Sequence, residues 1–415
     1  MDGDVRRRGG RVVNDSPANS TSLITATSTK TPIWRTLVWV ILPLLVLAAA
    51  IWWLIATNPI ARFDNGAPPV EALTVERTIL DQNGLRLLVR AGGSEPMTIA
   101  QMQVDAAYWE FVQTPAGPIA RGDTAWISLP FPWVLGEAHT VVFVTNTGAT
   151  FEHAIPVAVA TPVATSGNLV SQAILGAFVG ILPVAVGLMF YPALRGAGPA
   201  TMDFLLALTV GLLGFLIVDT LEDALEFAAQ AAAVFQGQAM VVLTAAASFL
   251  LLMAVSRRQG RPSGLALAAY IALGIGLHNL GEGLAIGAAF AAGAAGLGTF
   301  LVIGFTLHNI TEGIGIAAPI LKVRPPLWAF AALTLLAGGP AVAGIWLGSL
   351  AYAPHWSALA LAIGAGAILQ VIVEVGALLA RNRGGANAAI SSPPVLAGLA
   401  VGVAFMYVTA MLVKI

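Results

Sequence analysis

The chain has 415 residues, of which 57% are hydrophobic and only 10% are charged, whereas soluble globular proteins carry about 25% charged residues. A soluble fold of this size cannot bury so much apolar surface, so most of the chain is expected to face lipid. The absence of cysteine excludes disulfides, thiolate metal sites and cysteine nucleophiles, and the balance of 20 basic against 21 acidic residues gives no sign of a nucleic-acid partner. We therefore expect an integral membrane protein.

The N-terminal part divides into a polar tail and an apolar helix. Residues 1–33 contain a group of arginines and a stretch rich in Ser, Thr and Asn, which is typical of a disordered basic tail on the cytoplasmic side. Residues 34–58 are apolar. A secretory signal peptide is the alternative, but the run is too long and starts too late for one, so we predict an uncleaved transmembrane anchor helix.

Residues 59–166 have the pattern of a small β domain. Short alternating segments are separated by turn sequences such as Asn83-Gly84 and Gly92-Gly93. This pattern predicts an extracytoplasmic all-β sandwich of about 100 residues, and both a cupredoxin-like and an immunoglobulin-like form fit it. We favour a structural or dimer-stabilising role over metal capture or partner docking. The predicted strands lie at residues 72–79, 85–89, 99–104, 124–129 and 140–145.

Residues 167–415 are predicted to form an α-helical polytopic bundle. Its apolar stretches each reach the ~20 residues that the hydrocarbon core of a bilayer requires. Eight spans are predicted, at residues 169–194, 202–226, 238–256, 264–290, 294–320, 326–351, 356–380 and 393–413. With the anchor helix the expected number of membrane-spanning helices is nine.

The basic residues predict the orientation in the membrane. Lysine and arginine concentrate in cytoplasmic loops. If the N-terminal tail is cytoplasmic, every basic loop of the bundle falls on the cytoplasmic side, and the β domain and the C-terminus lie outside. The predicted location is the plasma membrane, or the inner membrane of a two-membrane cell. The basic residues of these loops are Arg195, Arg257, Arg258, Arg261, Lys322, Arg324, Arg381 and Arg383.

A six-residue motif occurs twice near the middle of two consecutive predicted spans. The sequence His-Asn-x-x-Glu-Gly begins at residue 278 and again at residue 308. In each copy the histidine and the glutamate are four positions apart and share one helix face. Two facing helices would bring imidazoles, carboxylates and amides to one point, a donor set that suits Zn²⁺, Fe²⁺, Co²⁺, Ni²⁺ or Mn²⁺ rather than Cu(I). The predicted ligands are His278, Asn279, Glu282, His308, Asn309 and Glu312.

Two alternative roles for the motif stay open. The polar groups could be neutral and bond only to one another between helices. The two histidines could instead ligate a haem, although a haem site does not call for two buried carboxylates. Ionisable residues cost roughly 2.5–3.5 kcal/mol each inside a membrane on insertion scales, and the exact repeat of the motif favours a metal site.

The doubled motif resembles the metal-binding signature of the ZIP (Zrt/Irt-like) family of divalent metal transporters, especially its bacterial GufA-like branch. The resemblance covers about residues 168–415. It implies an eight-span bundle, a homodimer, and a transport site at the six motif residues, with spans one, four, five and six moving as a unit against the others. The family often has proline before the motif glutamate, where this chain has Gly281 and Thr311.

Charge counting predicts one bound metal rather than two. Glu282 and Glu312 together neutralise one divalent cation, and a second would leave about two buried positive charges with neutral donors, at a severe desolvation cost. Some members of the ZIP family hold a second metal with an acid just before a proline in span six. Here that acid is replaced by Gly339, which precedes Pro340.

Acidic residues outside the motif are candidates for the ion path. Four acids near the end of the second bundle span fall within one arc of the helix, where they form either an entrance that concentrates cations or a solvated helix end. Glu374 in span seven serves the exit path or bonds to a neighbouring helix, and we favour the exit. The four acids are Asp219, Glu222, Asp223 and Glu226, with Asp219 the preferred gate ligand.

The sequence as a whole predicts a secondary transporter. Divalent metal, with Zn²⁺ the first choice, would pass from outside into the cytoplasm by an alternating-access, elevator-like movement. The site glutamates would bind protons when the metal leaves. Metal is then a substrate, no resident cofactor is expected, and the protein is not expected to be an enzyme. The alternatives are an intramembrane zinc-dependent enzyme and a metal sensor that binds without flux.

Overall fold

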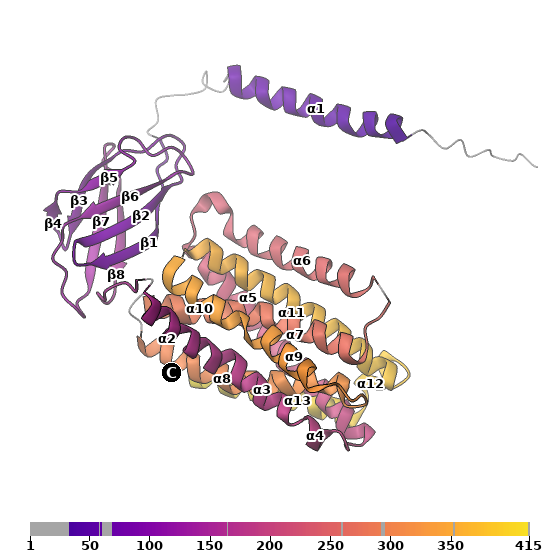
Figure 1. Ribbon diagram of the computed structural model, residues 1–415. Helices are drawn as coiled ribbons and strands as arrows, with labels where there is room; N and C mark the ends of the chain where they lie inside the picture. The colour runs from indigo at the N-terminus through magenta and orange to yellow at the C-terminus, as the bar shows by residue number, and fades with distance from the viewer. Residues whose placement is uncertain are drawn as a thin grey trace, which may run out of the picture. The chain divides into compact units, whose positions relative to one another are not determined.

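The computed structural model describes residues 33–57, 59, 69–163, 165–258, 260–291, 295–351 and 353–413 (Figure 1). The expected basic tail, except for its last residue, lies outside the described residues. The chain divides into two compact units, Met1–Ala67 and Pro68–Ile415. The first unit contributes helix α1 (Ile33–Thr57), which coincides with the expected anchor and has no buried residues in its most apolar window.

The β region contains two four-stranded sheets in which all neighbouring strands are antiparallel. Side chains from both sheets share one hydrophobic core, in which Leu87, Ile127 and Phe143 are fully buried. The expected two-sheet β region is therefore present. The first sheet has the order β1 (Leu73–Asp81), β2 (Gly84–Ala91), β6 (Thr124–Leu129) and β5 (Val112–Thr114), and the second has the order β4 (Ala107–Trp109), β3 (Ile99–Val104), β7 (His139–Thr145) and β8 (Thr150–Ile155).

Alternation and turn chemistry explain the strands that were expected. In β6 every second residue is buried, as a strand with one face on a core requires. The turn from β1 to β2 needs glycine at Gly84, where φ is +117° and a Cβ atom would lie 2.2 Å from the Leu129 oxygen. Three strands were not expected. Two of them, β4 and β5, have only three residues each, and β8 carries the polar residues Glu152 and His153.

Nine helices among the described residues are long and apolar enough to cross a membrane, judged by length and composition. This is the character expected of a polytopic membrane protein. Within the second unit the helical elements are α2 (Ser166–Gly176), the π-helical turn η2 (Ala177–Ile181), α3 (Leu182–Met189), α4 (Tyr191–Leu194), α5 (Pro199–Gln230), η3 (Ala233–Phe235), α6 (Gly237–Ser256), α7 (Gly264–Ala291), α8 (Ala295–Ala317), η4 (Ala318–Ile320), α9 (Leu327–Gly338), α10 (Pro340–Ala351), α11 (Pro354–Asn382), α12 (Ala386–Ile390) and α13 (Pro393–Val413).

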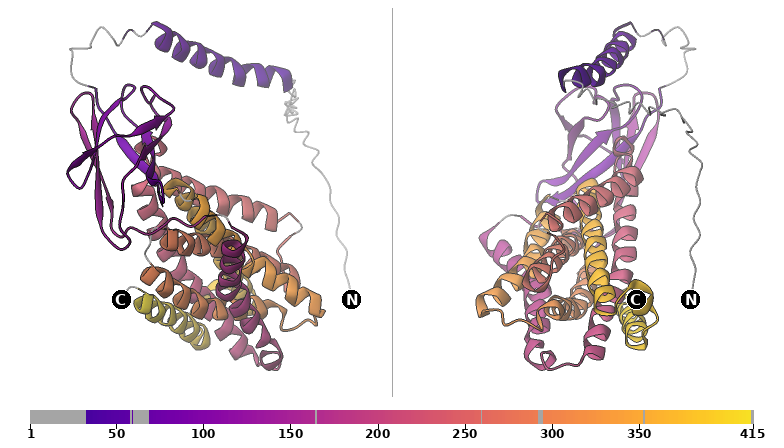
Figure 2. Two further views of the ribbon diagram at one scale, coloured as in Figure 1. Left: turned by 60° about the vertical axis from the view of Figure 1, so that its left-hand side comes forward. Right: turned by 90° about the vertical axis from the view of Figure 1, so that its right-hand side faces the viewer.

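Close backbone contacts group these helices into two sets. In the first set, α7 and α10 interlock so tightly that a Cβ atom on Gly283 or Gly344 would lie 2.2 Å from a main-chain oxygen of the other helix, and α3 approaches α8 as closely at Gly187. In the second set, α5 meets α13 at Gly211, and α6 meets α11 at Gly366, with corresponding distances of 2.4 and 2.2 Å. Figure 2 shows α13, in yellow, running alongside the bundle. Glycine permits this contact because it has no side chain to keep the backbones apart.

Backbone approaches between the two sets are less close, since a Cβ atom on Gly364 of α11 would first meet the His278 Cα atom of α7, at 3.1 Å. A Cβ atom on Gly274 or Gly281 of α7 would first meet side-chain atoms of Val371 or Leu361 on α11, at 2.6 and 2.7 Å. A Cβ atom on Gly315 of α8 would first meet the side chain of Thr209 on α5, at 2.8 Å. Judged by these closest backbone approaches, the first set consists of α2, η2, α3, α7, α8, α9 and α10, and the second of α5, α6, α11 and α13.

Candidate metal-binding site

The two copies of the motif lie on α7 and α8, in the interior of the bundle. Their histidines, asparagines and glutamates are between 0 and 5% exposed. The rings of His278 and His308 have their centroids 6.4 Å apart, so the two motif faces meet as the four-residue spacing predicts. The structure therefore brings together all the residues that the sequence proposed as ligands.

Three of these side chains form the closest group of potential ligands. Ligand atoms from His278, His308 and Glu312 all lie within 4.8 Å of one another. Ligands of a tetrahedral zinc, about 2.0–2.1 Å from the metal, are separated by about 3.3 Å. Side-chain rotations that shorten the longest distance between two of these ligand atoms by at most about 1.5 Å would place all three atoms around one ion. Among the described residues, this is the one group of three or more His, Asp or Glu side chains with such spacing.

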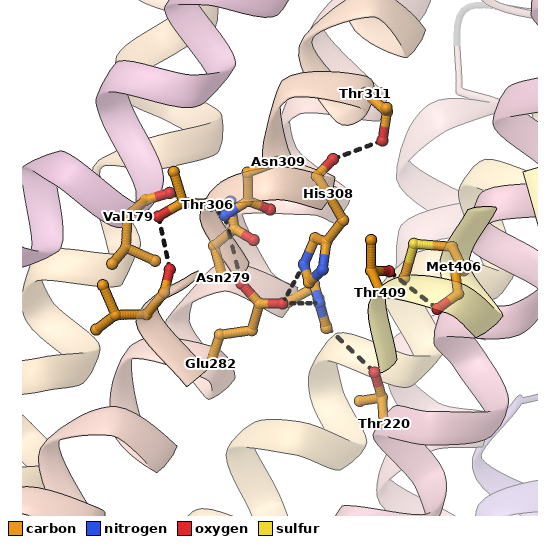
Figure 3. Close-up of polar contacts among 12 residues, drawn as sticks. Val179, Thr220, Asn279, Glu282, Thr306, His308, Asn309, Thr311, Met406 and Thr409 are labelled. Atoms are coloured by element: carbon orange, nitrogen blue, oxygen red, sulfur yellow. Dashed lines mark hydrogen bonds and ion pairs between the residues drawn. The ribbon is translucent and has the colours of Figure 1, made fainter. Parts of the chain in front are cut away.

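Glu282 occupies a different position from Glu312. Its Oε1 atom accepts hydrogen bonds from Nε2 of His278 at 2.9 Å and from Nε2 of His308 at 2.6 Å. Figure 3 shows Glu282 facing His308. Its Oε2 atom accepts a long contact of 3.5 Å from the Asn309 amide. Glu282 thus orients both imidazoles, and it can itself become a ligand if the imidazoles turn from it to a cation.

Several buried oxygen atoms of the site have no hydrogen-bond partner among the described residues. They are both carboxylate oxygens of Glu312 and the Oδ1 atoms of Asn279 and Asn309. The Asn279 amide lies beside Glu312, but neither carboxylate oxygen has a hydrogen bond of normal geometry. A buried acceptor without a donor is costly, and a buried charge more so. Helices that only bonded to one another would have paired these acceptors, so the arrangement suits a cation.

Thr220 on α5 contacts the site and was not among the residues expected from the sequence. Its Oγ1 atom lies 3.3 Å from Nδ1 of His278. A neutral His278 imidazole whose Nε2 donates to Glu282 would accept the Thr220 proton at Nδ1. This bond connects the two sets of helices at the site. In the sequence, Thr220 directly follows Asp219, the preferred gate residue, and this position is the signal that could have identified Thr220.

The acids at the end of α5 differ in their surroundings. Asp219 is half-buried, and the next residue, Thr220, contacts the motif histidine His278. Asp223 is half-buried as well, whereas Glu222 and Glu226 are exposed. Asp219, Glu222 and Asp223 all have interactions with other residues. The entrance role of the four acids stays a prediction.

Glu374 is part of an ion pair away from the motif. It is 1% exposed and accepts hydrogen bonds from Ser256 Oγ at 3.2 Å and from Arg257 Nε at 3.0 Å. These contacts connect α11 to the end of α6. Bonding to a neighbouring helix was one of the two expectations for this residue, and its role in an exit path stays a prediction.

The histidines of the β domain take part in separate pairs. His139 contacts Asp105 at 2.7 Å, and the backbone N–H of Thr140, followed by this His139 contact, keeps the pKa of Asp105 below its usual value. His153 lies 2.9 Å from Thr78 Oγ1, and burial lowers its pKa. Neither pair includes the three converging ligands that a metal site requires.

A comparison of the chain with protein-family models finds no match, and a comparison with curated proteins finds none either. Any function assigned to the chain therefore depends on the geometry of the site.

Proposed function

We propose that this protein is a secondary transporter of divalent metal cations and a distant member of the ZIP family, with Zn²⁺ the preferred substrate. The observation that carries the proposal is the convergence of His278, His308 and Glu312 beside oxygen acceptors that have no donor among the described residues. Nitrogen and oxygen donors of this kind suit borderline divalent cations. The site lies within helices long and apolar enough to span a membrane, where ionisable residues usually serve transport.

The two sets of helices support a movement that would carry the metal. All six motif residues belong to the first set, whose members interlock through their backbones. At Gly274, Gly281 and Gly315 the second set contacts α7 and α8 first through side-chain atoms, and the backbone approach of Gly364 to His278 is looser, at 3.1 Å. Side chains can change rotamer as helices slide. The first set corresponds to spans one, four, five and six, the group that the resemblance implies will move. The bond from Thr220 to His278 would then break and re-form during each cycle.

The proposed direction of transport follows from the charge pattern. Basic loops would face the cytoplasm, which places the acids at the end of α5 outside and Glu374 toward the inside. Metal would approach along the row from Glu226 to Asp219, bind at the motif, and leave toward the cytoplasm past Glu374. The working form is proposed to be a homodimer, with the β domain outside the membrane.

The experiment is metal uptake by proteoliposomes containing the full chain. Uptake of Zn²⁺, Fe²⁺, Mn²⁺ and Cd²⁺ is measured for the wild type and for Glu312→Gln, which removes a carboxylate but keeps the shape of the side chain. We expect saturable uptake by the wild type, fastest with Zn²⁺, and none above the protein-free background for Glu312→Gln.

The matched control is Asp203→Asn. Asp203 is another buried carboxylate, 4% exposed, and it pairs with Arg383 at 2.5 Å, outside the motif. Uptake per folded Asp203→Asn molecule should equal that of the wild type. Metal binding without uptake by the wild type would contradict transport and support a sensor, and equal uptake by Glu312→Gln and the wild type would contradict the site.

A further inference from the structure

The two asparagines of the motif are held by main-chain carbonyl groups of two other helices. Nδ2 of Asn309 donates to the Val179 oxygen at 3.1 Å, and Nδ2 of Asn279 donates to the Ala337 oxygen at 3.0 Å. A carbonyl oxygen only accepts, so each amide must present its NH₂ end to the backbone and turn Oδ1 away from it. Both asparagines are fully buried, and both Oδ1 atoms have no partner among the described residues. In Figure 3 Asn309 lies between Val179 and the Glu282 carboxylate.

Each of these carbonyl groups comes from a point where a helix is irregular. Val179 lies within the π-helical turn η2, and such turns occur mostly as single interruptions of α-helices, often at functional sites. Ala337 is the second-last residue of α9. The helix is interrupted at Gly339, and α10 begins at Pro340, which has no N–H group. Carbonyls at helix ends and interruptions are available to donors outside their own helix. The two amides are therefore anchored in the same way.

The two irregular points touch each other. Gly180 directly follows Val179, and Gly338 directly follows Ala337. A Cβ atom on Gly180 would lie 2.3 Å from the Gly338 oxygen, and a Cβ atom on Gly338 would lie 2.5 Å from the Gly180 oxygen. One backbone crossing therefore sets the positions of both anchoring carbonyls. The two glycines have no side chain that could bind a metal, so any effect they have on the site is indirect.

We infer that the Gly180–Gly338 crossing is a positioning element of the metal site, which acts through the Val179 and Ala337 carbonyls to aim the asparagine oxygens at the ion. This inference rests on the proposed function, because it gives the asparagines a role as oxygen ligands. The crossing lies within the first set of helices, so the aim of both amides is kept while that set moves as a unit.

The test measures Zn²⁺ binding by equilibrium dialysis and Zn²⁺ uptake for the same preparations of the full chain. Gly180→Ala and Gly338→Ala force the crossing apart without altering a ligand. We expect each to weaken Zn²⁺ binding about ten- to a hundredfold, the loss typical of residues that orient metal ligands. The matched control is Gly398→Ala at the crossing of α13 and α5, where the Cβ atom would lie 2.3 Å from the Phe204 oxygen. This control should bind Zn²⁺ as the wild type does.

A background without the asparagine side chains shows whether the crossing acts through them. In the variant Asn279→Ala/Asn309→Ala, adding Gly180→Ala should cause no further loss of Zn²⁺ affinity, because the carbonyls no longer have an amide to hold. If the loss is the same with and without the asparagines, the crossing affects only general packing and the inference is wrong.

A second variant keeps the inference testable if the glycine variants do not fold. Asn309→Asp supplies a charged oxygen but loses the NH₂ donor that faces the Val179 oxygen. We expect at least tenfold weaker Zn²⁺ binding for this variant, the lower end of the range for orienting residues, and tighter binding would overturn the inference. Zn²⁺ binding without uptake by the wild type contradicts the proposed function alone. Wild-type uptake together with tight binding by Gly180→Ala and Asn309→Asp contradicts the positioning role alone.

Discussion

Neutralising Glu312 should change the stability and the metal affinity of the protein in opposite directions. Glu312 is 5% exposed, and neither of its oxygens has a hydrogen-bond partner among the described residues. A carboxylate in that position is costly until a cation binds it, whether the cost appears as buried charge or as forced protonation. Glutamine in its place is neutral, and its amide oxygen can accept from the Asn279 amide that lies beside residue 312.

The expected size of both effects can be worked out. An unpaired buried charge costs several kcal/mol, and an imperfectly paired glutamine amide costs about 1–3 kcal/mol. Metal-free Glu312→Gln should therefore be more stable than the wild type by a net amount on the order of 2 kcal/mol. Metal at 100 times its dissociation constant should add about 2.7 kcal/mol to the stability of the wild type and nothing to that of the variant.

The assay is thermal unfolding of the detergent-solubilised full chain, with chelator and with Zn²⁺. The midpoint with chelator should be higher for Glu312→Gln than for the wild type, and only the wild-type midpoint should rise with Zn²⁺. Asp203→Asn is the control. This variant should have a lower midpoint because it leaves Arg383 unpaired. The loss in free energy of unfolding should be less than the 3–5 kcal/mol of a fully buried pair, since Arg383 is 33% exposed. The midpoint of this variant should still rise with Zn²⁺. A lower midpoint for metal-free Glu312→Gln, or a Zn²⁺ response like that of the wild type, would refute the reasoning.

Three further predictions concern other parts of the molecule. Thr220→Val removes the donor to His278 and should weaken Zn²⁺ binding about tenfold in equilibrium dialysis, whereas Thr209→Val, whose hydroxyl bonds to its own helix, should not; equal affinities would rule out an orienting role. Burial lowers the pKa of His153, so the unfolded state binds the proton more readily, and the β domain should lose stability as the pH falls from about 6.5 toward the lowered pKa. The protection factors of the β1 and β8 amides against hydrogen exchange should fall at low pH in the wild type but not in His153→Gln. An equal fall in both proteins would contradict the assignment. Because the chain has no cysteine, single cysteines report the orientation cleanly: Ala116→Cys should react with an impermeant maleimide on intact cells and Arg261→Cys only after permeabilisation, and the reverse pattern would invert the proposed topology.

Some features of the fold follow directly from the amino-acid pattern. Apolar length alone predicted the positions of the long helices, because a helix facing lipid needs no polar face. Alternation predicted the longer strands with one face on a core, such as β6. It could not reveal β4 and β5, since three residues are too few to show a period. These short strands are held by pairing with β3 and β6 and not by their own pattern.

The candidate site is divided in the same way between sequence and structure. The repeated motif and the four-residue spacing determined which side chains share a helix face, because the period of an α-helix is a local property. Only the tertiary structure decided that Glu312 converges with the histidines as a potential ligand while Glu282 is hydrogen-bonded to both imidazoles. It alone also decided that Asn309 is anchored by a carbonyl 130 residues away. Contacts of this kind depend on the rotation and register of one helix against another, which close glycine crossings set and which no local pattern contains.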